Sequence, residues 1–164
     1  MRWLFDTDDS RARLFQRLVL AVVIFAHGAQ KLFGWWGGQG LSATVRGMSA
    51  HLPVAIVWLD VVIETLGALA LAVGLFGRLG ALGIAAVMVG AIATVHAPNG
   101  FFMNWGGRRG GEGFEYHLLA LALALPIVVL GSGAWSLDRA IARRRVAPRE
   151  RRVPVGAPPA PRPI

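Results

Sequence analysis

The sequence predicts an all-α integral membrane protein, a bundle of four transmembrane helices with both termini in the cytoplasm. Composition is the first reason: of the 164 residues, 55% are hydrophobic and only 16% are charged, and the mean hydropathy is +0.54. A soluble domain usually carries about 25% charged residues. The second reason is that the apolar residues fall into four stretches, each close to the roughly 20 residues that cross a bilayer. A chain of this length is expected to form one compact domain.

The four expected spans follow one another along the chain. They cover residues 14–33, 54–76, 79–97 and 117–135, within a transmembrane domain of residues 14–138. Residues 1–13 form a short cytoplasmic segment, in which Asp6, Asp8 and Asp9 are unlike the basic start of a signal peptide, so we expect the first helix to be retained. Residues 139–164 are rich in Arg and Pro without apolar periodicity, which predicts a disordered cytoplasmic tail.

The arginines predict the orientation. Most of them lie on the side of the two termini and the second turn, whereas the opposite side has Arg46, Arg108 and Arg109, with Lys31 at a helix end. Basic residues accumulate in cytoplasmic loops, so both termini are expected in the cytoplasm. The basic tail lacks the interleaved aromatic residues of nucleic-acid-binding segments. We therefore expect contact with the lipid bilayer and no nucleic-acid partner.

Ionisable side chains inside the spans collect toward one face of the membrane. An intramembrane charge costs about 2.5–3.5 kcal/mol on insertion scales, so such groups usually mark a site or a partner. With a rise of about 1.5 Å per residue and helices of alternating direction, these groups fall in the extracytoplasmic half. They are His27, Lys31, Asp60, Glu64, His96, Glu115 and His117. The pattern predicts a polar pocket that opens to the extracytoplasmic side, with the cytoplasmic half free of such groups.

The spacing indicates how these groups face. Asp60 and Glu64 are four residues apart and share one face of a helix, as do His27 and Lys31. We expect Glu64 to face the bundle interior, with a nitrogen from the first or third span within hydrogen-bonding reach. Two interpretations stay open: a functional pocket, and a buried ion-pair network that only fixes helix register.

Composition also constrains the cofactors. The chain has no cysteine, which excludes disulfides, thiolate-bound iron–sulfur clusters and covalent c-type haem. His27 and His96 are weak evidence for a metal or haem because they lack a helix-spaced carboxylate–histidine motif, so no metal site is expected. A quinone is the candidate ligand, because its reduction needs protons at two carbonyl oxygens and a cluster of His, carboxylate and Lys side chains can deliver them. Trp36, Phe102 and Trp105 are the expected ring contacts. No residue is singled out as catalytic.

Four stretches carry the most specific pattern. They are HGAQKLFGWWGGQGL (27–41), ETLGALALAVGLFGRLGAL (64–82), HAPNGFFMNWGG (96–107) and GFEYHLLALALAL (113–125). They resemble the DoxX family of small four-helix bacterial membrane proteins, over roughly residues 14–138. The resemblance implies a multi-pass bundle in the bacterial cell (inner) membrane. It also implies polar motif positions, which do not include Asp60, at His27, Lys31, Glu64, His96, Glu115 and Tyr116.

The resemblance implies function only coarsely. The family takes its name from a membrane subunit of a thiosulfate:quinone oxidoreductase, related members are linked to oxidative-stress complexes, and distant relatives assist membrane-protein assembly. We expect a membrane subunit of a quinone-linked or oxidative-stress oxidoreductase system, with oxidoreductase subunits or a second copy as partners. Whether the chain is itself an enzyme stays open. The alternative is a non-catalytic scaffold or assembly factor. A transporter would need polar groups at both faces, which the sequence does not suggest.

Overall fold

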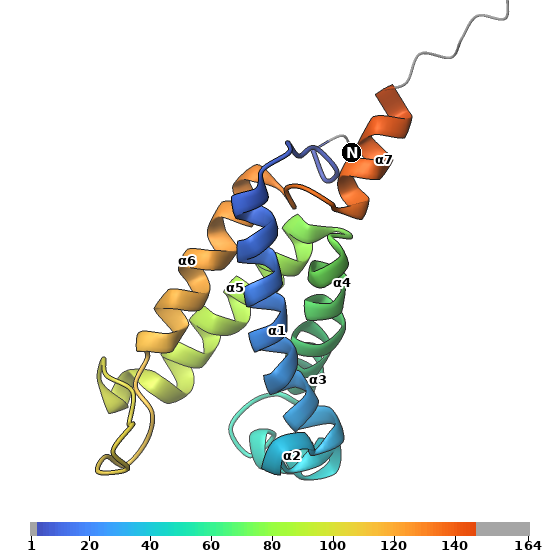
Figure 1. Cartoon of the computed structure of the whole chain (residues 1–164). Coiled ribbons are helices and arrows are strands. Elements are labelled where there is room, and N and C mark those ends of the chain that lie inside the picture. Colours follow the sequence, from blue (N-terminus) through green and yellow to red (C-terminus); the bar gives the residue numbers. More distant parts are fainter. Residues whose placement is uncertain (1–2, 147–164) are drawn as a thin grey trace, which may run out of the picture.

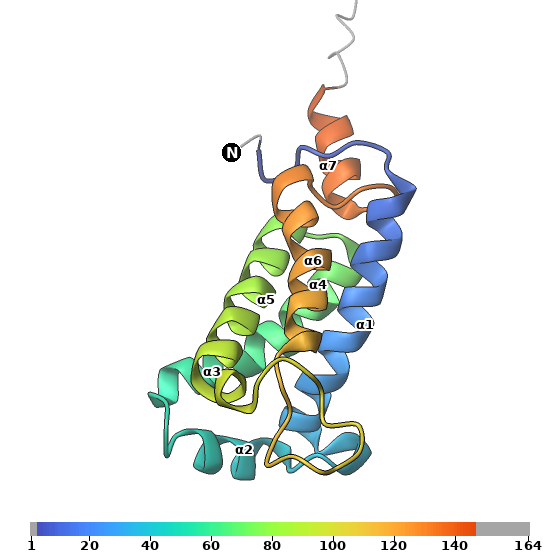
Figure 2. The same ribbon diagram turned by 90° about the vertical axis from the view of Figure 1, so that its left-hand side faces the viewer.

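The computed structural model describes residues 3–146, and all regular elements in this part are helices (Figure 1). The N-terminal segment and α7 lie at the same end of the bundle (Figure 1, Figure 2). We call this end the terminal end and the opposite one the cavity end. In chain order the elements are α1 (Arg11–Phe33), η1 (Trp35–Gly37), α2 (Gly40–Met48), α3 (Val54–Val62), η2 (Ile63–Gly67), α4 (Ala68–Val73), α5 (Gly77–Ala91), η3 (Ile92–His96), η4 (Ala97–Asn99), α6 (Glu115–Leu130) and α7 (Leu137–Val146).

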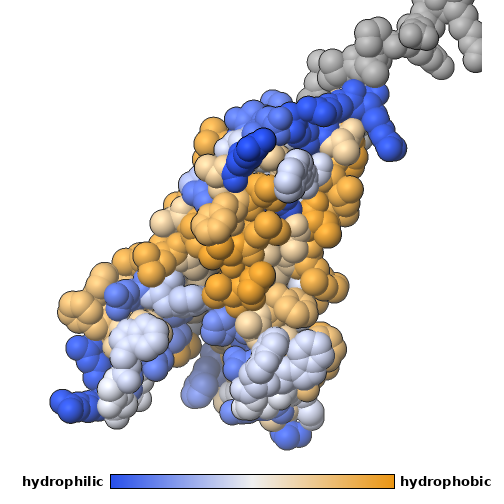
Figure 3. All heavy atoms as spheres, viewed as in Figure 1, coloured by the Kyte–Doolittle hydropathy of each residue, from blue (hydrophilic) through white to orange (hydrophobic). Residues whose placement is uncertain are grey.

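Three helical rods within residues 3–146 are long and apolar enough to cross a membrane. They are α1, the rod α3–η2–α4 (Val54–Val73) and the rod α5–η3–η4 (Gly77–Asn99), whereas α6 is apolar but shorter. A hydrophobic band crosses the middle of the molecular surface, with polar residues at both ends (Figure 3). The predicted all-helical class and the apolar character of the long helices are confirmed.

Local sequence signals set the ends of α1. The Ser10 hydroxyl accepts a hydrogen bond from the backbone N–H of Arg13 at 3.3 Å, the usual N-cap arrangement. Gly34 ends the helix in the left-handed conformation (φ 74°), which glycine adopts without steric cost. Between these ends, Leu20 and Ile24 are buried in the core. The first helix therefore runs from the terminal end to the cavity end.

Two of the rods contain a π-helical turn. Glu64 lies in η2, and His96 is the last residue of η3. In η2 the Thr65 hydroxyl donates to the carbonyl oxygen of Val61, one turn earlier. A π-turn is a local widening of an α-helix and is frequent at functional sites. Hydropathy does not reveal such turns, and neither was expected from the sequence.

The fourth helix is shorter than expected. α6 ends at Leu130 and not at residue 135, because Gly131 (φ 87°) and Gly133 (φ 76°) adopt conformations that end a helix. A Cβ on Gly131 would lie 2.6 Å from the carbonyl oxygen of Asp6, so this turn lies directly against the N-terminal segment. Pro126 lies inside α6 without ending it.

Two segments expected to be irregular contain helices. α7 continues through Val146, because its Ala and Arg residues favour helix and Arg139 pairs with Asp9. The expected tail therefore begins later than residue 139, and its remainder, residues 147–164, lies outside the described residues. In the first connection, α2 lies across the cavity end (Figure 2).

Buried arginines close the terminal end, although this half was expected to be free of buried charge. Arg17 is 1% exposed and donates to carbonyl oxygens at the end of α4 and after α6, among them Leu71 at 2.9 Å and Ser132 at 3.1 Å. Arg78 donates to the carbonyl oxygen of Val128 at 2.8 Å, near the end of α6. The last carbonyl groups of a helix have no partner within it. The guanidinium groups supply such partners, and the Leu71 carbonyl also accepts from the backbone N–H of Gly74.

A carboxylate from α7 completes this closure. Asp138, which is 1% exposed, accepts from the backbone N–H groups of Phe76 at 2.8 Å and Gly77 at 2.9 Å, where α5 begins. It also accepts from the Ser132 hydroxyl at 2.6 Å. Asp138 thus acts as the N-cap of α5 from another helix. The buried charges of the terminal end serve to close helix ends.

Candidate functional site

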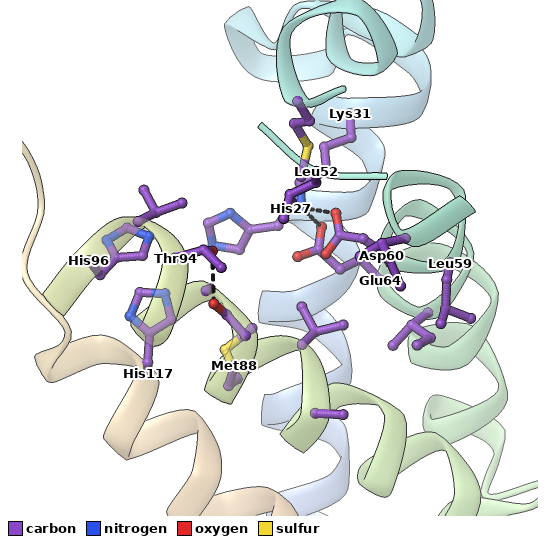
Figure 4. Close-up of a pocket in the computed structure, with 18 of the residues that line it drawn as sticks. His27, Lys31, Leu52, Leu59, Asp60, Glu64, Met88, Thr94, His96 and His117 are labelled. Atoms are coloured by element: carbon purple, nitrogen blue, oxygen red, sulfur yellow. Dashed lines mark hydrogen bonds and ion pairs between the residues drawn. The ribbon is translucent and has the colours of Figure 1, made fainter. Parts of the chain in front are cut away.

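A cavity of about 570 Å³ lies at the cavity end. It lies between one arm made of α1, α2 and α3 and a second arm made of α5 and α6. The two arms diverge toward this end (Figure 1), and the molecular surface is hollowed between them (Figure 3). The polar lining groups form two clusters, one on each side of His27 (Figure 4). Much of the wall is apolar and includes Leu52, Ile56, Leu59, Ile63, Val87 and Met88.

The first cluster, which we call the ionic cluster, consists of Lys31, Asp60 and Glu64. The Lys31 ammonium on α1 lies 2.5 Å from Asp60 Oδ2 on α3 and 2.7 Å from Glu64 Oε2 in η2. The contact with Glu64 is a close ion pair, and the Glu64 side chain is 5% exposed. The prediction that Glu64 faces the interior, close to a nitrogen of the first span, is confirmed.

Gly28 allows the ionic cluster to form. A Cβ on Gly28 would lie 2.6 Å from the carbonyl carbon and oxygen of Glu64, and 2.8 Å from Cγ2 of Thr65. No side chain fits there, so α1 and η2 meet at backbone distance, as small residues permit between membrane helices. Because Lys31 lies about one turn farther along α1, the same contact brings its ammonium to Glu64.

The second cluster, which we call the histidine cluster, consists of His27, His96 and His117, with Tyr116 beside them. The ring centroids of His96 on η3 and His117 on α6 are 4.1 Å apart. The Tyr116 ring lies 5.3 Å from that of His117 and 5.5 Å from that of His27. His96 Nδ1 lies 2.8 Å from the carbonyl oxygen of Glu112. His27 lies between the other two histidines and the ionic cluster (Figure 4).

Apart from Glu64 Oε2, which forms the ion pair with Lys31, two buried polar atoms beside the cavity have no hydrogen-bond partner within residues 3–146. They are the Tyr116 hydroxyl and His117 Nδ1, and both residues line the cavity. Buried polar groups are normally paired, and leaving one unpaired costs about 1–3 kcal/mol. A molecule in the cavity with complementary polar atoms would remove this cost.

Most of the expected pocket residues come together in this cavity. The expected residues that line the cavity are His27, Lys31, Asp60, Glu64, His96, Tyr116 and His117. They come from four different helices, and all lie toward the same end of the bundle. In the described part of the chain, no group of three or more His, Asp or Glu side chains is placed to hold a metal ion.

Glu115 and the three expected ring contacts do not line the cavity. The Glu115 carboxylate accepts from the backbone N–H of Met103 at 3.2 Å, and so fixes the connection before α6. Trp36, Phe102 and Trp105 are 67%, 59% and 90% exposed. They lie in connections between the rods, whose conformation hydropathy does not predict. These four residues therefore lie outside the lining of this cavity.

Four lining residues that were not expected from the sequence come from connections and not from the spans. They are Met48, Leu52, Met103 and Glu112. A signal for the first of them exists, because Leu41, Val45 and Met48 recur with the spacing of one helical face, which indicates α2. Nothing in the glycine-rich stretch around Glu112 indicates that this residue borders the cavity.

In the comparison with known proteins, one family model matches the part of the chain that forms the first three rods. The DoxX family model matches residues 12–97, which is more than half of the chain. The match includes the ionic cluster, His27 and His96, whereas α6 with Tyr116 and His117 lies beyond it, although the resemblance noted above extends farther. No curated protein and no solved structure matches the chain. The chain belongs to the DoxX family.

Proposed function

We propose that this membrane protein binds the ring of a quinone in its cavity, as a membrane subunit of a quinone-linked or oxidative-stress oxidoreductase system. The cavity volume of about 570 Å³ supports this, because small-molecule sites measure about 300–1,000 Å³. The lining also supports it, because such sites are mostly apolar with a few polar groups that orient the ligand.

The observation that carries the proposal is the pair of unpartnered polar atoms. The Tyr116 hydroxyl, and the His117 ring in the matching tautomer, can each donate a hydrogen bond to a molecule in the cavity. A quinone has carbonyl oxygens at two edges of a flat ring, and both accept hydrogen bonds. Tyr116, His117 and Lys31 all line the cavity, so we place the ring beside His27, with these donors around it.

Ionisable residues of the cavity can supply the protons that the reduction of a quinone consumes. Reduction of a quinone to a quinol takes up two electrons and two protons. In our proposal a reduced cofactor of a partner subunit supplies the electrons, and this chain supplies the site. A carboxyl group and imidazoles are the usual proton donors in such sites, and Glu64 and His27 line the cavity. Lys31 holds Glu64 in place.

We place the cavity on the extracytoplasmic side of a bacterial inner membrane. The support is the excess of arginines in the segments of the terminal end, including the first turns of α1 and the exposed turns of α7. Basic residues of this kind favour the cytoplasm. A fusion of alkaline phosphatase to the C-terminus that is active outside the cytoplasm would contradict this orientation.

Binding of a small quinone tests the proposal. The protein is reconstituted in lipid nanodiscs and titrated calorimetrically with a methyl-substituted benzoquinone that has no tail. Calorimetry is preferred to fluorescence quenching because no tryptophan of residues 3–146 lines the cavity. We expect saturable binding that is weakened by Glu64→Gln and unchanged by Glu115→Gln, which alters a carboxylate outside the cavity. Absence of saturable binding to the native chain overturns the proposal.

A second candidate is a non-catalytic scaffold or assembly factor, and the ionic cluster favours it. Lys31 links α1 to α3 and η2 through charge pairs that need no ligand. In that case Glu64→Ala lowers the unfolding temperature in detergent, while cells that carry the variant keep the phenotype of the native chain. Loss of that phenotype in Glu64→Gln, at an unchanged unfolding temperature, rules this candidate out.

A further inference from the structure

An apolar groove lies next to the cavity on the outside of the bundle. It has a volume of about 310 Å³ and lies between the rod α3–η2–α4 and α5. Ile63 lines both the cavity and the groove, so the two spaces meet at this side chain. The groove is lined by Gly67 and Ala70 on one side, and by Leu79 and Gly80 on the other.

The residues that line the two spaces form one stripe along α5 and η3. Gly80, Gly83, Val87, Gly90 and Thr94 recur at intervals of three or four residues, which is the spacing of one helix face. At about 1.5 Å per residue this stripe is roughly 21 Å long, a large part of the roughly 30 Å of a bilayer core. The cavity and the groove therefore lie end to end along this face, on either side of the Ile63 side chain, with polar groups toward one end.

The groove faces the surface that lipid covers in a bilayer. Leu66 and Leu79 line it and are 61% and 49% exposed. All of its lining residues are apolar or glycine, and the small residues Gly67 and Gly80 leave room between the two rods. A hydrocarbon chain suits such a groove, whereas a polar group would find no hydrogen-bond partner among these side chains.

We propose that the groove holds the hydrocarbon tail of the ligand whose ring occupies the cavity. The ligand class is then a membrane-borne quinone with an isoprenoid or alkyl tail, which enters sideways from the bilayer between α3 and α5, past Ile63. This inference rests on the proposed function, and it adds the type of quinone and its route of entry.

A second copy of the chain is the other occupant to consider. Small residues also let two membrane helices approach closely. The groove differs from an ordinary helix contact because it adjoins a cavity with polar groups at Ile63. A contact between two helices does not require such a cavity beside it, whereas an amphiphile with a polar ring and an apolar tail requires a polar and an apolar space next to each other. We therefore assign the groove to the tail.

Photolabelling locates the tail. The probe is a benzoquinone with a decyl tail that carries a diazirine near its middle, added to the native chain in nanodiscs. Mass spectrometry then maps the labelled residues. We expect the label within residues 62–83, on the two faces that border the groove. An excess of the methyl-substituted benzoquinone without a tail should remove this label, because both rings compete for the cavity.

Two variants that fill the groove sharpen this test. A Cβ on Gly67 meets only the Ile63 side chain, at 3.7 Å and 3.9 Å, so the backbone tolerates Gly67→Leu, and Ala70→Phe is the second variant. Gly47→Leu is the matched control, because its Cβ has no atom within 4 Å and it lines neither space. Labelling should fall about threefold or more in both groove variants, since only packing holds a tail that could otherwise lie in lipid.

Binding of the quinone without a tail should stay the same in both groove variants, which also shows that they are folded. If that quinone binds while the tail labels α1 or α6, the groove assignment is overturned and the proposed function stands. If neither quinone binds the native chain, both are overturned. If the native chain is a dimer that Gly67→Leu converts to a monomer, the groove holds a second copy of the chain, and its assignment to the tail is overturned.

Discussion

The terminal end and the cavity end both bury ionisable and polar side chains, but they satisfy them differently. At the terminal end Arg17 and Asp138 are bonded to backbone groups where helices begin or end. One atom at this end, Arg78 Nε, has no partner, but the same guanidinium donates to carbonyl oxygens through both of its other nitrogens. At the cavity end the Tyr116 hydroxyl and His117 Nδ1 have no partner in the part of the chain that the structure describes. Burial of a polar group is therefore a weak sign of function. An unpaired polar atom beside a cavity is a stronger one, because a ligand can pair with it.

Loss of Arg17 should have the largest effect. Arg17→Ala leaves the buried carbonyl group of Ser132 without its donor and removes one of the two donors of the Leu71 carbonyl, which also accepts from the backbone N–H of Gly74. It also empties a site lined by several other carbonyl groups, so we expect the free energy of unfolding to fall by about 3 kcal/mol or more. Unfolding in detergent, followed by circular dichroism, measures it. Arg11→Ala is the control, because Arg11 is exposed in the first turn of the same helix. An Arg17→Ala protein as stable as the native one would contradict a structural role for the terminal end.

A methyl group on Gly28 should have the next largest effect. In Gly28→Ala the new Cβ would lie 2.6 Å from the backbone of Glu64, so α1 and η2 must separate. We expect a loss of about 1–3 kcal/mol, typical of overpacking, together with weaker quinone binding because Lys31 moves away from Glu64. Gly47→Ala, where the Cβ meets no atom within 4 Å, should change neither quantity. Unchanged binding in Gly28→Ala would show that the ionic cluster does not serve the ligand.

Glu64→Gln should act on binding more than on stability. The amide keeps the shape of the side chain and loses the exchangeable proton and the charge opposite Lys31, which retains Asp60 as a partner. We expect binding of the quinone without a tail to weaken by about tenfold, or roughly 1.4 kcal/mol, as calorimetry would measure. The unfolding temperature should change little. The reverse result, a large loss of stability with native binding, would favour the scaffold.

Tyr116→Phe should have the smallest effect on stability. The substitution removes a buried hydroxyl that has no partner within residues 3–146, so the free energy of unfolding should stay the same or rise by up to about 1 kcal/mol. Quinone binding should weaken by about fivefold, as expected for one lost hydrogen bond of about 1 kcal/mol. A clear loss of stability without ligand would show that the hydroxyl is paired in the unliganded protein.

The ionic cluster was predictable because its geometry follows from span length and direction. Lys31 lies near the end of the first span and Glu64 follows the start of the second, so their depths agree once the helices are antiparallel. Gly28 determines which turns of α1 and η2 are in contact. The sequence alone does not show that the two helices meet at this glycine. The π-turn around Glu64 leaves no mark in hydropathy.

The terminal end was less predictable, for a physical reason. The partners of Arg17 are backbone carbonyl groups of residues such as Leu71, and every residue carries such a group. No side-chain pattern distinguishes these carbonyls, so an arginine near the start of a span indicates only orientation. The exposed rings of Trp36 and Trp105 were misplaced for a related reason, because their directions depend on how the connections fold.

One measurement distinguishes the roles of the two ends. It is the increase in unfolding temperature when the methyl-substituted benzoquinone is added, compared between Arg17→Lys and Tyr116→Phe. Ligand that binds only the folded chain raises this temperature. Lysine cannot reproduce the fork of guanidinium donors, so Arg17→Lys should unfold at a lower temperature and still gain the full increase. Tyr116→Phe should unfold at the native temperature and gain a reduced increase. Equal increases in both variants, or no increase in the native chain, would contradict the division into a structural end and a ligand-binding end.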